Sequence, residues 1–250
     1  MNNKKRIVII GATSAMAEHC ARLWAQGQSL DLTLVGRDAV RTERIAVDLR
    51  VRSPQSDIHI IQADFIDPAN IQTTVDGIAM QGAVDIVLIA HGSLPEQTNC
   101  QNDLQMCSDA LEINGISPVL FAEAFAKHMA KANHGTLVLI GSVAGDRGRK
   151  SNYIYGSAKG LVTRYAQGLQ HRFSGTGVKV VLVKPGPTDT PMTAHLKTQG
   201  SKLASVEEVA QSIVDAVERG QLTVYAPKKW KLIMFIIQHL PNIIFHKLNI

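Results

Sequence analysis

Short, nearly continuous apolar runs alternate with helical patterns along this chain, and this alternation constrains the fold more than any other feature. Such runs are typical of strands that are buried on both faces of a parallel sheet. Helices between successive strands then cover both faces. The sequence therefore predicts an α/β fold, a single-domain doubly wound parallel sheet of about seven strands. The predicted strands are residues 6–10, 32–35, 58–63, 84–90, 136–140, 178–183 and 222–225.

A turn of small residues, GATSAMA (residues 11–17), follows the first predicted strand and precedes a helical pattern. Such a turn lets a pyrophosphate approach the backbone and lie at a helix N-terminus, where free N–H groups favour an anion. Ala15 and Ala17 stand where glycines often occur. The turn predicts a dinucleotide site of the Rossmann type, with a plain strand–helix turn as the alternative. The expected cofactor contacts are Gly11, Thr13, Ser14, Ala15 and Met16.

The end of the second predicted strand bears on the choice of cofactor. Dinucleotide proteins specific for NAD usually place an acid there to bind the ribose hydroxyls. This strand is instead followed by Gly36 and Arg37. A guanidinium at that point suits a 2′-phosphate. Arg37 therefore favours NADP(H) over NAD(H), and an ordinary surface arginine that opens a helix is the alternative interpretation.

Other candidate contacts lie at the ends of the remaining strands, because ligands of doubly wound sheets bind beyond the carboxyl ends of the strands. Asp64 could cap a turn or bind the adenine edge, and Gly92 permits a close approach of the backbone. We interpret His91 as a spacer. The set expected near the cofactor from these strand ends is Asp64, Phe65, Ala90, Gly92, Pro185, Gly186, Thr188 and Thr190.

Tyr155 and Lys159 are four residues apart in a helical pattern and so lie on one face, one turn from each other. An ammonium beside a phenol favours the phenolate, so we expect the pKa of Tyr155 to fall below its usual value of about 10. Such a phenol exchanges protons near neutral pH. The alternative is an amphipathic helix with a solvated lysine. Ser142, at a strand end, and Asn114, where Gly and Pro interrupt a long helical pattern, complete the expected constellation.

The chain resembles the classical short-chain dehydrogenase/reductase family over residues 6–192. Asn114, Ser142, Tyr155 and Lys159 occur in the family's order and spacing, together with the Pro185–Gly186 turn and Thr190. The family implies an NAD(P)-dependent oxidoreductase that forms homo-oligomers. Two stretches depart from its pattern: alanines replace glycines in the first turn, and AHG (residues 90–92) replaces Asn-Ala-Gly.

The same resemblance implies a role for each catalytic residue. Tyr155 would donate a proton to the substrate carbonyl oxygen, and Ser142 would hydrogen-bond that oxygen. Lys159 would lower the pKa of Tyr155 and bind the nicotinamide ribose. Asn114 would hold a water molecule of a proton relay, and Pro185 to Thr190 would contact the nicotinamide end.

A narrower resemblance, to the keto-reductase component of decaprenylphosphoryl-ribose 2-epimerase, covers nearly the whole chain. It is carried by SVAGDRGRKSNYIYG (residues 142–156), by residues 193–196 and by parts of residues 225–248. It implies reduction of a ketone on a sugar, a polyprenyl-phosphate-linked keto-pentose, in cell wall or polysaccharide biosynthesis. Two alternatives stay open: a general reductase of small ketones or acyl substrates, and a non-catalytic NADP-sensing regulator. The complete catalytic set disfavours the regulator, because a sensor needs no proton donor.

Residues 228–250 (KKWKLIMFIIQHLPNIIFHKLNI) follow the last predicted strand as an apolar tail. Only six consecutive residues, 232–237, are apolar, and Pro241 interrupts the pattern, whereas a membrane-spanning helix needs about 20. Flanking lysines and Trp230 suit an interfacial segment. We therefore expect peripheral membrane contact through 228–250, with packing on the chain's own domain or on a partner subunit as the alternatives.

Composition limits the remaining possibilities. The 250 residues show no interior linker or repeat, so residues 1–227 are expected to form one dinucleotide-binding and catalytic domain, and 228–250 only a tail. The net charge is +5, and the basic residues are scattered along the chain. This distribution disfavours nucleic-acid binding and permits an anionic ligand or lipid. Three cysteines without a Cys-x-x-Cys motif predict neither a disulfide scaffold nor a metal site. A reducing, cytoplasmic location follows, at the inner face of the membrane if the tail binds lipid.

Overall fold

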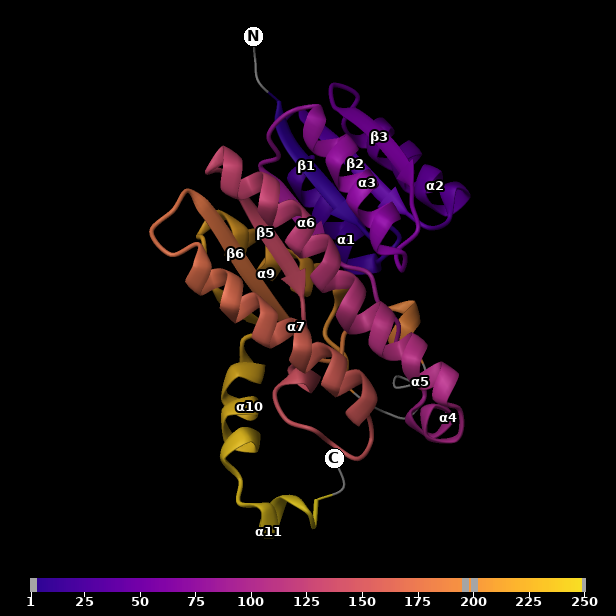
Figure 1. Ribbon diagram of the computed structural model, residues 1–250, viewed down its shortest axis with the longest axis vertical. Helices are drawn as coiled ribbons and strands as arrows, with labels where there is room; N and C mark the ends of the chain where they lie inside the picture. The colour runs from indigo at the N-terminus through magenta and orange to yellow at the C-terminus, as the bar shows by residue number, and fades with distance from the viewer. Residues whose placement is uncertain (1–3, 195–197, 199–201, 249–250) are drawn as a thin grey trace.

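The computed structural model describes residues 4–194, 198 and 202–248 (Figure 1). Within them, seven parallel strands form one sheet in the order β3-β2-β1-β4-β5-β6-β7. This confirms the predicted doubly wound parallel sheet. The strands are β1 (Lys5–Ile10), β2 (Leu30–Gly36), β3 (Asp57–Gln62), β4 (Ile86–Ile89), β5 (Gly135–Ile140), β6 (Val178–Pro185) and β7 (Thr223–Ala226).

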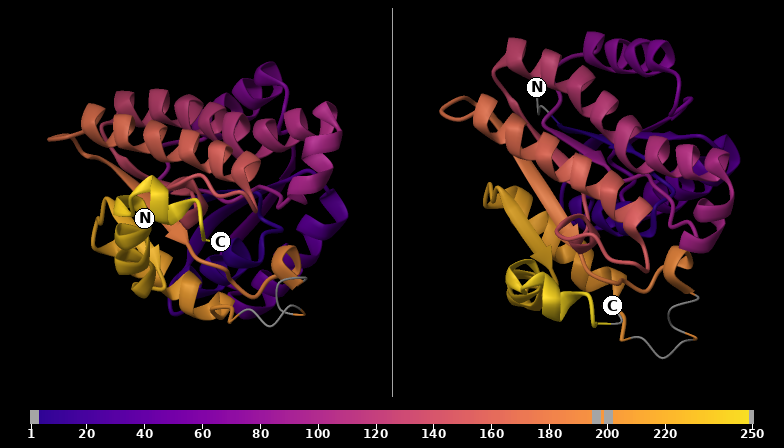
Figure 2. Two further views of the ribbon diagram at one scale, coloured as in Figure 1. Left: turned by 90° about the horizontal axis from the view of Figure 1, so that it is seen from below. Right: turned by 60° about the horizontal axis from the view of Figure 1, so that its bottom comes forward.

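Helices cover both faces of the sheet (Figures 1 and 2). One face packs against α1 (Ala15–Trp24), α2 (Ala39–Arg52) and α9 (Val206–Glu218). The other packs against α3 (Pro68–Met80), α6 (Ser117–Ala132) and α7 (Tyr153–Arg172). The two layers explain why the strands read as unbroken apolar runs. In β1, for example, Ile7 and Ile9 enter the core under α1 and α9, whereas Val8 and Ile10 enter the core under α3 and α6.

The strand order changes direction between β1 and β4. The chain runs outward from β1 through β2 to β3 and then returns to place β4 on the other side of β1. At such a switch point the loops after the two strands diverge and leave a crevice beyond the carboxyl ends. The turn after β1 and residues 90–92 after β4 therefore face each other there.

The long helical pattern expected from residue 104 to 133 is divided, as the Gly and Pro in it predict. It forms α5 (Leu104–Leu111), a π-helical turn η1 (Glu112–Ile116) and then α6. A short helix, α4 (Gln97–Asn102), precedes it and was not predicted. Two 3₁₀ turns, η2 (Val143–Gly145) and η3 (Pro191–Thr193), follow β5 and β6. Of the narrower resemblance, His195 and Leu196 lie outside the described residues.

The tail forms two helices, α10 (Lys229–His239) and α11 (Asn242–Phe245). Met234 of α10 is fully buried. Both helices extend away from the sheet toward the bottom of Figure 1, with α10 beside α7 and α11 below it. No helix among the residues described here is long and apolar enough to cross a membrane.

Candidate active site

Tyr155 and Lys159 project from the first turns of α7 toward the carboxyl end of β5. Two glycines let the helix approach this closely: an added Cβ would lie 2.6 Å from the Lys159 carbonyl at Gly145 and 2.9 Å from the Ala144 carbonyl oxygen at Gly156. The helix therefore rests directly on the turn that follows Ser142. Lys159 is 3% exposed and its Nζ lies 5.8 Å from the centre of the Tyr155 ring.

The expectation that the pKa of Tyr155 falls below its usual value is wrong. Burial raises the pKa of Tyr155, and a hydrogen bond with Ser142 offsets only part of this rise. Lys159 Nζ donates a hydrogen bond to the Ile140 carbonyl at 3.0 Å. Its own pKa is lowered by burial to about 8. Burial thus disfavours the phenolate form of Tyr155.

Asn114 lies in the π-helical turn η1 and is fully buried. Its Nδ2 donates to the Ala110 carbonyl at 2.9 Å, and its Oδ1 accepts from the Ser93 backbone N–H at 2.8 Å. A Cβ added at Gly92 would lie 2.8 Å from Asn114 Oδ1 and 3.7 Å from Lys159 Nζ. Only a residue without a Cβ at position 92 therefore leaves room between the Asn114 amide and the Lys159 ammonium.

The turn after β1 has the features of a phosphate site. Gly11 adopts φ +82°, and an added Cβ would lie 2.6 Å from the His91 backbone nitrogen. Only glycine fits there. Ser14 caps α1 but its side chain makes no capping hydrogen bond, so it leaves the first-turn N–H groups for a ligand. These residues fit the pyrophosphate of a dinucleotide.

His91 is more than the spacer that the sequence indicated. Its ring packs between Phe65 and Phe121, with centroids 4.7 and 5.6 Å away, and its Nε2 is 2.8 Å from Ser117 Oγ. Burial lowers the pKa of His91 to about 3, so the ring is neutral. Phe65 is only 2% exposed. Its ring belongs to this core cluster, so the expected contact of Phe65 with a cofactor is restricted to its backbone.

Arg37 and Asp64 lie at the outer end of the same edge. Arg37 is exposed directly after β2, and its positive charge lowers the pKa of Asp64 slightly. The larger causes are backbone N–H groups: Asp64 Oδ1 accepts from Ile66 at 2.6 Å and from Asp67 at 3.0 Å. The Asp64 carboxylate therefore caps a turn, the first of the two roles considered for it. The Arg37 guanidinium remains at the surface.

One cavity brings most of the predicted residues together. It is lined by Ser14, Met16, Ala90, Gly92, Asn114, Ser142, Tyr155, Lys159, Pro185, Gly186, Thr188 and Thr190, and also by His91, Ile140, Gly141, Met192 and Thr193. The predicted residues outside this lining are Gly11, Thr13, Ala15, Arg37, Asp64 and Phe65. All catalytic candidates thus share one cavity, and the residues outside it lie toward the expected pyrophosphate and adenine end.

Trp230 packs on a cavity-lining residue, a contact that the sequence did not reveal. A Cβ at Gly186 would lie 1.9 Å from its indole nitrogen, so the indole lies on the backbone at the expected nicotinamide end. A tryptophan beside lysines is typical of a membrane interface, and only the folded chain shows that residue 230 meets residue 186.

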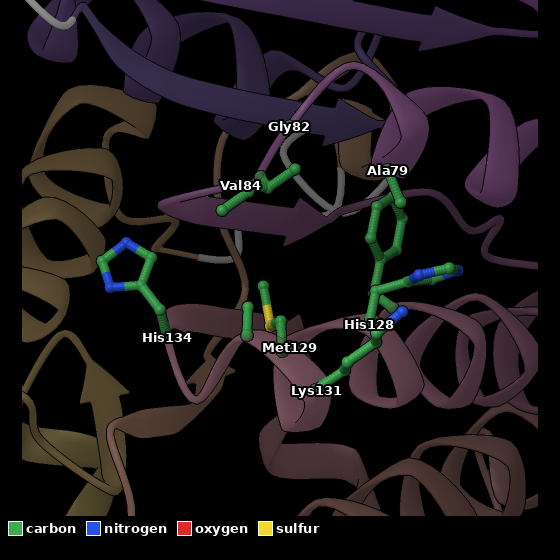
Figure 3. Close-up of a pocket in the computed structure, with 10 residues that line it drawn as sticks. Ala79, Gly82, Val84, His128, Met129, Lys131 and His134 are labelled. Atoms are coloured by element: carbon green, nitrogen blue, oxygen red, sulfur yellow. The ribbon is translucent and has the colours of Figure 1, made fainter.

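A second cavity, of about 340 Å³, lies at the opposite end of the sheet (Figure 3). It is lined mainly by α3, α6 and the segments that precede β4 and β5, and includes His128 and His134. Each histidine already contacts a carboxylate: Asp76 at 2.6 Å and Asp85 at 2.7 Å. The cavity contains none of the catalytic candidates. No cluster of three potential metal ligands occurs in the part of the chain that the structure describes.

Comparisons with known proteins agree with this geometry. Residues 5–201 match the family model described as short chain dehydrogenase. An uncharacterised oxidoreductase of Streptomyces coelicolor is 29% identical over 98% of this chain and 96% of its own length. Another uncharacterised oxidoreductase, of Mycobacterium tuberculosis, is 28% identical over 97% and 96%, respectively.

Solved structures share the fold. A short-chain dehydrogenase from Sphingobium yanoikuyae in complex with NADPH superposes with a TM-score of 0.81, at 24% identity, over 95% of this chain and 97% of that one. A bulky-bulky ketone specific alcohol dehydrogenase from Comamonas testosteroni gives 0.80, also at 24% identity, over 96% of each chain. At this identity the likeness supports the fold alone.

Proposed function

Since this chain belongs to the short-chain dehydrogenase family and is an NAD(P)-dependent oxidoreductase, we propose that it uses NADPH to reduce a ketone on a polyprenyl-phosphate-linked keto-pentose. The observation that carries the proposed chemistry is geometric: Ser142, Tyr155, Lys159 and Asn114 line one cavity beyond the carboxyl ends of the strands. The narrow resemblance of residues 142–156 supports the sugar substrate.

The cofactor, when bound, supplies a hydride to the carbonyl carbon. The chain's own residues donate a proton and a hydrogen bond to the carbonyl oxygen of the substrate. Tyr155 transfers its phenolic proton to the carbonyl oxygen as negative charge develops there, and the Ser142 hydroxyl donates a hydrogen bond to that oxygen. Lys159 and Asn114 then return a proton to the phenolate through the space beside Gly92. The product is the secondary alcohol.

Tyr155→Phe tests this assignment because it removes the proton donor and little else. Turnover should fall by at least about 100-fold, measured by NADPH absorbance with a 2-keto pentosyl polyprenyl phosphate, while NADPH binding is retained. Tyr165→Phe is the matched control, because Tyr165 lies on the same helix and its hydroxyl binds Glu123. Retained turnover in the Tyr155 variant would refute the mechanism. Equal turnover of a panel of soluble ketones by the unaltered enzyme would refute the proposed substrate.

We propose that NADPH is preferred because Arg37 presents a guanidinium directly after β2. Arg37→Ala should weaken NADPH binding and leave NADH binding nearly constant, as measured by titration of each cofactor. Arg41→Ala, also near the start of α2, controls for a general loss of positive charge. An unchanged ratio of the two affinities would remove this argument.

We also propose that the tail contacts an anionic membrane surface from the cytoplasmic side. Leu232, Phe235 and Ile236 of α10 are each more than half exposed, and Lys228, Lys229 and Lys231 flank them. A Phe235→Ser/Ile236→Ser variant should pellet less with anionic vesicles, and Val47→Ser, on the exposed side of α2, should not change pelleting. Equal pelleting of the double variant would overturn the membrane contact. Loss of self-association instead would identify the surface as a contact between subunits of a homo-oligomer.

A further inference from the structure

A cleft separate from the catalytic cavity lies between the loop that precedes α7 and the end of the tail. Its volume is about 420 Å³. One side is formed by Gly148, Arg149 and Lys150, and the other by Phe245, His246 and Leu248, with Tyr153 between them. The loop side of the cleft belongs to the segment that connects Ser142 to Tyr155.

The loop side of the cleft carries positive charge without a matching acid. Arg149 Nε is buried and has no hydrogen-bond partner. Within the described residues neither Arg149 nor Lys150 forms an ion pair. Burial lowers the pKa of Arg149, and the charge of Asp146, the nearest acid in sequence, offsets part of this effect. The Asp146 carboxylate itself is held by Lys184 and by the Tyr225 hydroxyl. A buried guanidinium donor without a partner is unfavourable unless a ligand supplies an acceptor.

The tail side of the cleft consists of two apolar side chains and His246, and it is fixed in place. Arg147 holds it: Nη1 donates to the Ile237 and Leu240 carbonyls at 2.5 and 2.7 Å, and Nη2 donates to Asn242 Oδ1 at 3.0 Å. The same guanidinium lies 3.7 Å from the centre of the Phe245 ring. The basic and apolar sides are therefore preformed relative to each other, although they are about 95 residues apart in sequence.

We propose that this cleft binds the phosphate of a polyprenyl phosphate ester at Arg149 and Lys150, with the first isoprene units against Phe245 and Leu248. A guanidinium suits phosphate oxygens, and apolar rings suit the hydrocarbon. The inference rests on the proposed function and deepens it, because it separates the place where the lipid phosphate binds from the place where the sugar ketone reacts. Inorganic phosphate offers the same anion without the hydrocarbon, so the two sources can be distinguished.

Isothermal titration calorimetry on the full chain with NADP⁺ tests the site. Farnesyl phosphate should bind at least about tenfold more tightly than farnesol or inorganic phosphate. Farnesol lacks the phosphate, and inorganic phosphate lacks the hydrocarbon chain. Arg149→Gln should weaken farnesyl phosphate binding at least about tenfold and leave farnesol binding unchanged. Lys150→Glu should also weaken farnesyl phosphate binding, and this exposed position lies outside the core. Lys131→Gln, beside the distant cavity of Figure 3, is the matched control.

Three results would overturn the site: equal binding of farnesol and farnesyl phosphate, equal binding of inorganic phosphate, or farnesyl phosphate binding that survives both Arg149→Gln and Lys150→Glu. These measurements need no turnover, so they separate the two proposals. The enzyme could reduce the keto-pentosyl lipid while Arg149→Gln and Lys150→Glu leave farnesyl phosphate binding unchanged. That result would refute the cleft alone. Arg149-dependent binding without reduction of that lipid would refute the proposed reaction and retain the cleft.

Discussion

Asp146→Asn tests whether a buried ion pair fixes the loop between Ser142 and Tyr155. The Asp146 carboxylate pairs with Lys184 of β6, and their side chains are 1% and 6% exposed. Asp146 Oδ2 also accepts a hydrogen bond from the Tyr225 hydroxyl at 2.9 Å. The substitution keeps the shape of the side chain but leaves the Lys184 ammonium buried without a counter-charge.

Breaking a buried pair by removing one partner lowers the free energy of unfolding by roughly 3–5 kcal/mol. A domain of this kind has only about 5–15 kcal/mol in total, so the urea midpoint should fall steeply. Glu43→Gln is the matched control. Glu43 pairs with Arg50 at 2.6 Å, but both side chains are more than 40% exposed, and removing such a surface pair changes stability by at most about 1 kcal/mol.

Urea unfolding followed by circular dichroism measures both variants, with the slope checked for two-state behaviour. A second substitution, Lys184→Met in the Asp146→Asn background, should recover much of the loss, because it removes the uncompensated charge. The reasoning fails if Asp146→Asn is no more destabilising than Glu43→Gln. It also fails if the double variant is as unstable as the single one.

Two further predictions concern the catalytic cavity and its cofactor turn. Gly11→Ala should unfold at a lower temperature and bind NADPH more weakly, because φ +82° and the contact with His91 both oppose a Cβ; Gly168→Ala, with open space around it in α7, should be neutral or slightly stabilising in the same thermal scan. Burial lowers the pKa of Lys159 to about 8 in the folded protein. Between pH 8 and the pKa of this lysine in the unfolded chain, the unfolded state binds more protons than the folded state, so the free energy of unfolding rises with pH. Relative to Lys159→Met, the unaltered protein should therefore gain stability from pH 8 to 10, and parallel curves for the two proteins would contradict this.

Features that depend on local pattern could be predicted from the sequence. The strands were found because residues on both faces of each strand are apolar, and both cores require this. The interruption near Asn114 was found because Gly115 and Pro118 cannot continue a regular helix unchanged, and a π-helical turn occurs there. The catalytic cavity followed from topology, since parallel strands bring their carboxyl ends to one edge.

Features that depend on distant contacts could not be predicted. The direction of the Tyr155 pKa shift depends on burial, which outweighs the hydrogen bond with Ser142. No local pattern indicates either. The hydrogen bonds from Arg147 to the tail carbonyls join residues more than 90 positions apart in sequence. An arginine in a polar loop gives no signal of such a partner, so the cleft between loop and tail became visible only in the folded chain.

The packing of Trp230 on Gly186 gives this protein an optical probe of its own active site. The chain contains two tryptophans, and the other, Trp24, is buried in the core under α1. A Trp24→Phe variant would therefore fluoresce from a single indole that lies on the Gly186 backbone, at the expected nicotinamide end. Energy transfer from that indole to a reduced nicotinamide would report the arrival and departure of the cofactor directly. Binding could then be followed in real time for any candidate substrate, including those that never react.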